Sequence, residues 1–86
     1  MKIELKVDRE YFEKILSGEK TFEIRLGDKD FNVGDTLILL EKDPDRKELT
    51  GRKIEKVITY LRNTKDIKHY SKEDIEKYGL QIIAFK

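Results

Sequence analysis

The sequence predicts one small α+β domain over residues 1–86, built on a closed or nearly closed β-barrel of about five short strands with two short flanking helices. The chain has 86 residues, which is the length of a single domain. Several short stretches alternate apolar and polar residues, as half-buried strands do, and two others follow helical spacing. In chain order these stretches read β-α-β-β-β-α-β, an order that suits a small barrel.

The first strand and the first helix are predicted at the N-terminus. Residues 2–7 alternate charged and apolar side chains, which is the pattern of a half-buried strand. Asp8 suits the N-cap of a helix, and Gly18 suits a left-handed C-terminal stop. Apolar residues between them fall at helical spacing, so we expect a short amphipathic helix at residues 9–17.

The second and third strands are predicted after this helix. Residues 20–26 return to alternation, and the pair Gly27-Asp28 marks a turn. Residues 36–41 carry an unbroken apolar run, which predicts a strand covered on both faces.

The fourth strand is predicted at residues 53–61, after a polar loop at residues 43–51. Its apolar positions do not keep strict alternation. A β-bulge near Lys56 or Val57 would explain the break in the pattern.

A second helix and a last strand complete the prediction. Ser71, with Asp74 three residues later, is similar to a capping box, and Gly79 is a natural stop. We therefore expect a helix at residues 72–78 and a strand at residues 80–85.

Composition excludes several kinds of chemistry. The chain has no cysteine, so disulfides, thiolate nucleophiles and cysteine zinc sites are impossible. His69, the one histidine, lies in a polar stretch, and a surface position is favoured over a catalytic or ligand role. We expect no metal and no cofactor. The N-terminus lacks the apolar core of a signal peptide, and the longest apolar stretch is too short for a membrane span, so a cytoplasmic protein is expected.

The charge is nearly balanced overall but divided unevenly along the chain. The formal net charge is +1. Residues 1–43 hold 8 basic and 11 acidic side chains, a balance of −3, whereas residues 44–86 hold 11 basic and 7 acidic ones, a balance of +4. Most of the excess lies at residues 46–68, which we call the basic strip. Such a strip contacts phosphates or is simply a solvated face, and the sequence leaves both interpretations open. Its basic members are Arg46, Lys47, Arg52, Lys53, Lys56, Arg62, Lys65 and Lys68.

The residues with the clearest chemical pattern are Lys20, Glu23 and Arg25. On a strand, Glu23 and Arg25 point to the same side, and Lys20 follows the helix-ending Gly18 closely enough to lean over the same surface. A guanidinium offers a planar fork to a phosphate or a base edge, a carboxylate accepts from an amine, and an ammonium supplies a point charge. The alternative is an ion ladder on a solvated face, which contributes little to stability.

The same segment resembles a known family. The pattern Gly18-x-Lys20-x-x-Glu23-x-Arg25 is similar to the signature of the ASCH domain, a branch of the PUA-like superfamily. The resemblance is closer still to a compact bacterial and phage branch described as a domain of unknown function, and it covers about residues 3–61. The stretches that carry it are Leu5-Lys6, Tyr11-Phe12, Ser17 to Arg25, Asp28 to Asp35 and Thr50-Gly51-Arg52.

The resemblance implies a PUA-like barrel with a cleft that binds RNA or a nucleotide-like ligand. Lys20, Glu23 and Arg25 would line this cleft by motif position. Four further residues match motif positions and are candidate ligand-binding residues, although the two aspartates also suit the capping of turns. They are Lys6, Asp28, Asp30 and Arg52.

Other functions stay open at this stage. Some relatives in the superfamily are amidohydrolases that act on acetylated cytidine, but they carry threonine where this chain has Glu23, which cannot perform the same alkoxide chemistry. A small hydrolase for a nucleoside or RNA is therefore the second hypothesis, and a protein-binding accessory domain is the third. Tyr60, Tyr70 and Tyr78 either stack on bases or pack at the core and helix edges.

Overall fold

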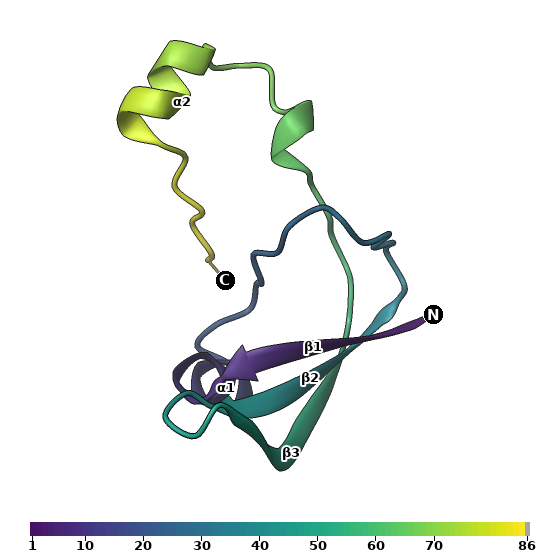
Figure 1. The fold of residues 1–86 in the computed structure, drawn as a ribbon. Helices are drawn as coiled ribbons and strands as arrows, with labels where there is room; N and C mark the ends of the chain where they lie inside the picture. Colours follow the sequence, from purple (N-terminus) through teal and green to yellow (C-terminus); the bar gives the residue numbers. More distant parts are fainter. Residues whose placement is uncertain (86) are drawn as a thin grey trace.

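Three strands and two α-helices make up the fold that the computed structural model describes for residues 1–85 (Figure 1). The strands form one sheet in the order β1-β2-β3, with β1 parallel to β2 and β2 antiparallel to β3. A single 3-10 turn, η1, precedes the second helix. The elements are β1 (Lys2–Asp8), α1 (Arg9–Leu16), β2 (Thr36–Asp43), β3 (Glu48–Val57), η1 (Thr64–Asp66) and α2 (Lys72–Tyr78).

The predicted five-stranded barrel is wrong. The sheet is open and has three strands among the residues described. Residues 20–26 and 80–85, which were expected to be strands, join no ladder in this part of the chain. The predicted order therefore loses its second and last strands.

A side-chain hydrogen bond, rather than a backbone ladder, connects residues 20–26 to β1. Arg25 donates from Nη2 to the backbone carbonyl of Lys6 in β1, at 2.5 Å. A neighbouring strand would need that carbonyl for its own ladder. Ile24 and Leu26 are 62% and 80% exposed, so the alternation does not mark a continuous buried face.

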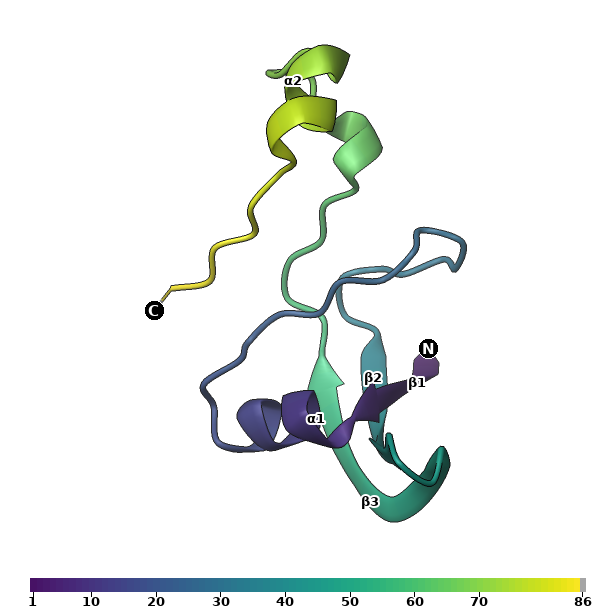
Figure 2. The same ribbon diagram turned by 60° about the vertical axis from the view of Figure 1, so that its left-hand side comes forward.

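Residues 80–85 lie apart from the sheet because the chain after β3 leads away from it. Figures 1 and 2 both show η1 and α2 standing off from the sheet and α1, with the last residues extended beyond α2. Phe85 is 91% exposed. The radius of gyration is 14.8 Å, larger than the roughly 12 Å of a compact domain of this length.

The third and fourth predicted strands exist with shifted limits. β2 extends to Asp43, and β3 begins at Glu48, so the expected polar loop shrinks to a short turn. The Asp43 side chain closes this turn by accepting from the backbone N–H groups of Asp45 and Arg46, at 2.9 and 3.3 Å. The β-bulge is also displaced from its predicted position near Lys56.

The bulge lies where Glu41 faces three residues of β3. Leu40 pairs with Lys53 and Lys42 pairs with Leu49, so Thr50, Gly51 and Arg52 lie opposite Glu41 alone. Gly51 has a φ of 96°, a left-handed conformation that glycine adopts without strain. The bulge bends β3 and aims both of its neighbours at Glu41.

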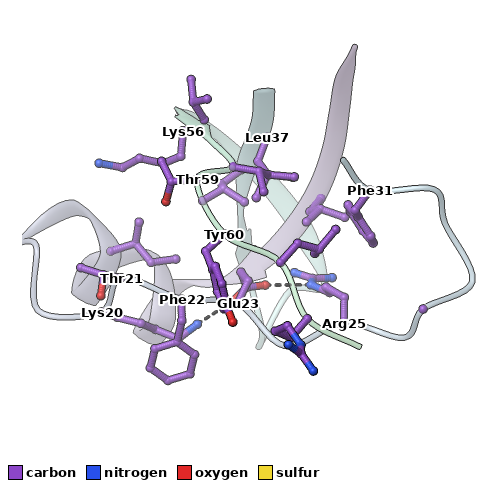
Figure 3. Close-up of a pocket in the computed structure, with 18 of the residues that line it drawn as sticks. Lys20, Thr21, Phe22, Glu23, Arg25, Phe31, Leu37, Lys56, Thr59 and Tyr60 are labelled. Atoms are coloured by element: carbon purple, nitrogen blue, oxygen red, sulfur yellow. Dashed lines mark hydrogen bonds and ion pairs between the residues drawn. The ribbon is translucent and has the colours of Figure 1, made fainter. Parts of the chain in front are cut away.

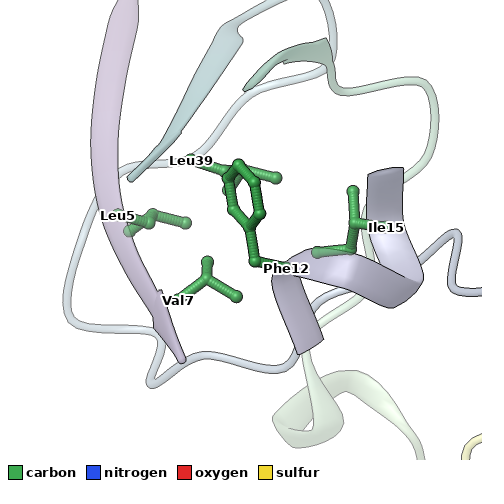
Figure 4. Packing of buried hydrophobic residues seen from close by; sticks show 5 residues of the cluster. All are labelled: Leu5, Val7, Phe12, Ile15 and Leu39. Atoms are coloured by element: carbon green, nitrogen blue, oxygen red, sulfur yellow. The ribbon is translucent and has the colours of Figure 1, made fainter. Parts of the chain in front are cut away.

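The core lies between α1 and one face of the sheet. The alternation of β1 places Leu5 and Val7 on this face, and Phe12 and Ile15 of α1 pack against them and Leu39 of β2 (Figure 4). Phe12 is 1% exposed. Burial of these side chains holds α1 across β1 and β2.

Both predicted helices are confirmed to within a residue. The side chain of Ser71 accepts from the backbone N–H of Asp74 at 3.1 Å, and Gly79 ends α2 with a φ of 71°. Asp8 occupies the N-cap of α1 but makes no capping hydrogen bond through its side chain. Neither helix, nor any other among residues 1–85, has the length and apolar character needed to cross a bilayer.

Candidate functional site

The end of α1 sets the position of Lys20. Gly18, with a φ of 84°, donates its backbone N–H to Ile15 and lets the chain reverse. The backbone N–H of Lys20 then donates to the carbonyl of Lys14 at 2.9 Å. The Lys20 ammonium lies 5.2 Å from the ring centroid of Tyr11 and 5.3 Å from that of Phe22. Both distances suit cation–π attraction, so the ammonium is held between two rings.

Lys20, Glu23 and Arg25 form one ion cluster, which we call the cavity cluster. Lys20 Nζ donates to Glu23 Oε1 at 2.5 Å, and Arg25 Nε donates to Glu23 Oε2 at 2.7 Å (Figure 3). Each carboxylate oxygen therefore has its own cation. The side chains of Lys20 and Glu23 are 15% and 16% exposed, and that of Arg25 is 33% exposed. The sequence-based grouping of these three residues is confirmed in space.

The cavity cluster lines a cavity of about 350 Å³. Its floor includes Leu5, Leu37 and Leu39 of the sheet. Its charged lining consists of four basic side chains and one acidic one. These are Lys20, Glu23, Arg25, Lys56 and Arg62.

A second wall of the cavity is formed by the segment that follows β3. Its start is fixed because Ile58 donates its backbone N–H to Asp35 and accepts from Gly34, both at 2.9 Å. From there the chain crosses the cavity, and Thr59, Tyr60 and Arg62 line it. We call residues 58–62 the crossing segment.

The two walls approach closely at Gly27. A Cβ atom added there would lie 2.8 Å from Nδ2 of Asn63, a distance that real Cβ contacts do not show. Glycine therefore lets the turn at residues 27–29 lie against the end of the crossing segment.

Lys6 contributes its backbone to the site. Its carbonyl accepts from Arg25 Nη2, so β1 helps to fix the guanidinium in place. The Lys6 residue is exposed and is not part of the cavity lining.

Arg52 lies in a different ion cluster, which we call the bulge cluster (Glu41, Thr50 and Arg52). Arg52 donates from Nε to Glu41 Oε1 at 3.0 Å and from Nη2 to Glu41 Oε2 at 2.6 Å. The Thr50 hydroxyl also donates to Oε1, and Arg52 contacts Glu13 of α1. The guanidinium carbon lies 5.0 Å from the ring centroid of Phe12. The cluster therefore ties β2, β3 and α1 together.

Electrostatics follow from these contacts. Hydrogen bonds from Arg52, and then from Thr50, lower the pKa of Glu41 to about 2. The same pairing with Glu41, followed by that with Glu13, raises the pKa of Arg52 above its ordinary value. Glu41 is 2% exposed, so it is a buried carboxylate whose charge is held by a bidentate guanidinium.

Asp28 and Asp30 lie on the surface at the turn after the cavity cluster. Asp28 lines a second, shallower hollow that shares Arg25 and Phe31 with the cavity. Asp30 is exposed and makes no hydrogen bond to any of residues 1–85. The structure brings Lys20, Glu23 and Arg25 together and places Asp28 beside them.

Sequence reasoning did not join the crossing segment to the motif. Lys56 and Arg62 were assigned to the basic strip and Tyr60 to the possible stacking residues, but nothing local says that they face Lys20. Glu41 was missed altogether. The sequence shows a lone carboxylate at the end of the apolar run 37–40, but only the strand register places Thr50, Gly51 and Arg52 opposite it.

Metal binding finds no support in this geometry. Among residues 1–85, no three histidine, aspartate or glutamate side chains gather where they could hold an ion.

Comparison with known proteins places the chain in a family. Residues 3–74 match the model described as "Domain of unknown function (DUF3850)". The chain belongs to the DUF3850 family. The matched region contains all of the cavity cluster, the bulge cluster and the crossing segment, and it ends inside α2.

A phage protein is similar to this DUF3850 chain. The "Uncharacterized 12.9 kDa protein in GpA 3'region" of Escherichia phage P2 is 40% identical over 63 residues, which is 73% of this chain and 56% of the phage protein. The chain thus spans little more than half the length of that relative. No solved structure matches the chain.

Proposed function

We propose that this DUF3850 chain is a nucleic-acid-binding module, with RNA as its first ligand, and that the cavity cluster is its binding site. The observation that carries the proposal is the charge of the cavity lining. Lys20, Arg25, Lys56 and Arg62 line it, with Glu23 as the one acidic lining residue. A concave site with this excess of positive charge favours an anionic ligand.

The hydrogen bonds of the cluster favour phosphate in particular. Both oxygens of Glu23 already accept from a cation. Among residues 1–85, Lys20 uses one of its three N–H donors and Arg25 two of its five. A ligand in the cavity therefore meets unused donors, and phosphate oxygens are acceptors that match them.

Glu23 acts as a positioning residue in this proposal. It holds the ammonium and the guanidinium on opposite oxygens of one carboxylate, while the Lys6 carbonyl fixes the far end of the Arg25 side chain. Donors that are already in place lose less conformational freedom on binding.

The rest of the proposal comes from the sequence. Phosphates further along a strand would contact the members of the basic strip other than Arg52, which Glu41 holds in the bulge cluster, since Lys56 and Arg62 belong to both the strip and the cavity. The resemblance to ASCH domains and the cytoplasmic location remain sequence-based proposals. A hydrolase and a protein-binding domain are tested as outcomes of the same experiment.

The test is a salt-dependent fluorescence-anisotropy titration with labelled single-stranded, hairpin and tRNA-like RNAs. Wild type is compared with Lys20→Ala/Arg25→Ala and with the charge-matched control Lys14→Ala/Lys77→Ala, whose residues lie outside the cavity lining. We expect binding that weakens with salt and is lost selectively in the first variant.

Two results would overturn the proposal. Flat curves for every RNA would exclude a nucleic-acid site, and nuclease-resistant capture of a protein would then favour a protein-binding domain. Turnover of single-stranded RNA or acetylcytidine that Lys20→Ala abolishes would replace binding with hydrolysis.

A further inference from the structure

The second wall of the cavity carries an exposed aromatic ring. Tyr60 is 75% exposed, although it lines the same cavity as Glu23 (Figure 3). Core packing, one of the two sequence-based interpretations of this tyrosine, is therefore wrong for Tyr60. An exposed ring next to a cluster of unused N–H donors needs another explanation, and base stacking supplies one.

The crossing segment places a cation beside this ring. Arg62 follows Tyr60 by two residues, and both line the cavity. Lys56, at the end of β3, lines it as well. Tyr60 thus has a cationic residue before it and another after it along the chain. With this arrangement a base can stack on the ring while the cations neutralise its flanking phosphates.

The size of the cavity limits what can enter it. Its volume of about 350 Å³ lies near the lower end of pockets for small ligands, which run from roughly 300 to 1,000 Å³. One nucleotide fits a hollow of this size, whereas a base pair inside a duplex keeps both of its faces stacked and cannot present one of them to Tyr60. The walls therefore favour a nucleotide that is unpaired.

We propose that the cavity takes one unpaired nucleotide of a single strand, with its base on Tyr60 and its phosphate on the cavity cluster and Arg62. This inference rests on the proposed function and adds to it that Tyr60 makes the protein discriminate single strands from duplexes.

The experiment measures binding of a labelled single-stranded octanucleotide and of a labelled, fully paired hairpin that has a non-nucleotide linker as its loop and the same number of phosphates. The variants are Tyr60→Leu, which removes the ring, and Tyr60→Phe, which keeps it. Tyr78→Leu is the matched control, since Tyr78 is 73% exposed on α2 and lies outside the cavity lining.

We expect the single strand to bind more tightly than the hairpin. Tyr60→Leu should weaken single-strand binding by about 5- to 150-fold, the range that corresponds to loss of one stacked base. Tyr60→Phe and Tyr78→Leu should bind as wild type does. The salt dependence should be the same in all variants, because no cation is lost. A nucleoside monophosphate should compete for the site better than inorganic phosphate.

The outcomes separate the two proposals. If wild type binds RNA but Tyr60→Leu binds equally well, or if the hairpin binds as tightly as the single strand, the stacking inference is overturned and the RNA site stands. If wild type binds neither RNA, both proposals fall.

Discussion

The cavity cluster and the bulge cluster use the same chemistry in opposite ways. Each is built on a glutamate that accepts from an arginine, and each has a second donor on the same carboxylate. Glu41 has a side chain that is 3% exposed, whereas that of Glu23 is 16% exposed and faces a cavity. Burial rather than residue type therefore separates a structural ion cluster from one that is open to a ligand.

In the bulge cluster the buried partner is the carboxylate: the Glu41 side chain is 3% exposed, whereas that of Arg52 is 47% exposed. Nε and Nη2 of Arg52 donate to Glu41, Nη2 also contacts Glu13, and the guanidinium lies over the buried ring of Phe12. The residues of the cavity cluster line a hollow instead. A motif arginine can therefore serve the fold or the ligand, and only its surroundings decide which.

The largest expected effect comes from breaking the bulge cluster. Arg52→Ala leaves Glu41 as a buried carboxylate without its bidentate partner, which is strongly destabilising. We expect the midpoint of thermal unfolding, followed by circular dichroism, to fall by roughly 10 °C or more. Arg46→Ala removes an exposed arginine from the same strip and should leave the midpoint nearly unchanged. Equal thermal midpoints for the two variants would mean that Arg52 does not stabilise the fold more than an exposed arginine does.

The second-largest expected effect is a loss of stability in acid, when Glu41 of the bulge cluster becomes protonated. The folded pKa of Glu41 is about 2, against an ordinary value of 4.5. Because the folded pKa is the lower one, the pairing stabilises the fold fully above about pH 4.5 and loses this contribution as pH falls toward 2. Thermal melts between pH 2 and 6 should show this loss in wild type.

Glu41→Gln sharpens the same measurement. The glutamine does not titrate, so the variant should be less stable at pH 6 but show a flatter fall in stability below pH 4.5. Some slope should remain, because the backbone N–H of Arg46 also lowers the pKa of Asp43. If the thermal midpoint of the variant falls with pH as steeply as that of wild type, Glu41 is not the carboxylate whose protonation lowers the stability.

The cavity cluster should respond more in binding than in stability. Lys20→Ala/Arg25→Ala leaves the Glu23 carboxylate, whose side chain is 16% exposed, without either cation, so we expect the thermal midpoint to fall, but by less than in Arg52→Ala, because the Glu41 side chain is only 3% exposed. Affinity for single-stranded RNA should fall roughly tenfold or more. The slope of log affinity against log salt should become shallower by about 1.4, since each phosphate contact contributes about 0.7. A lost affinity with an unchanged slope would mean that these cations do not contact phosphates.

The smallest expected effect is that of Arg25→Lys. Lysine keeps the charge, so the salt slope should stay as in wild type. It cannot donate to Glu23 and to the Lys6 carbonyl at once through a planar fork, so affinity should fall by a few-fold. Full wild-type affinity would show that only the charge of Arg25 counts. The same anisotropy titration measures both quantities.

Local signals in the sequence predicted the helices well. Ser71 and Gly79 enclose α2, and Gly18 ends α1, because caps and stops depend on a few neighbouring residues. Sheet pairing depends on contacts far apart in the chain, and here the prediction was wrong. Residues 20–26 alternate as a strand would, yet Ile24 is 62% exposed.

The candidate site was predictable only in part, for the same reason. The spacing of Glu23 and Arg25 puts both on one side of an extended segment, and the reversal at Gly18 brings Lys20 to the same surface, so their grouping followed from the sequence alone. Motif membership could not show that Arg52 turns toward Glu41, because that direction comes from the bulge at Gly51. It could not show either that Tyr60 crosses to the same cavity, because the fixing contacts of Ile58 with Gly34 and Asp35 are long-range.

The most direct test of the contrast between the two clusters is a crossed measurement on Arg25→Ala and Arg52→Ala. For each variant, the thermal midpoint and the affinity for single-stranded RNA are measured in one buffer, with binding recorded at a temperature where circular dichroism shows both proteins folded. We predict that Arg25→Ala has a lower affinity for single-stranded RNA and an unchanged thermal midpoint. Arg52→Ala should have a lower thermal midpoint and an unchanged affinity. Equal loss of affinity in the two variants, or equal loss of stability, would contradict the separation of a ligand-binding cluster from a structural one.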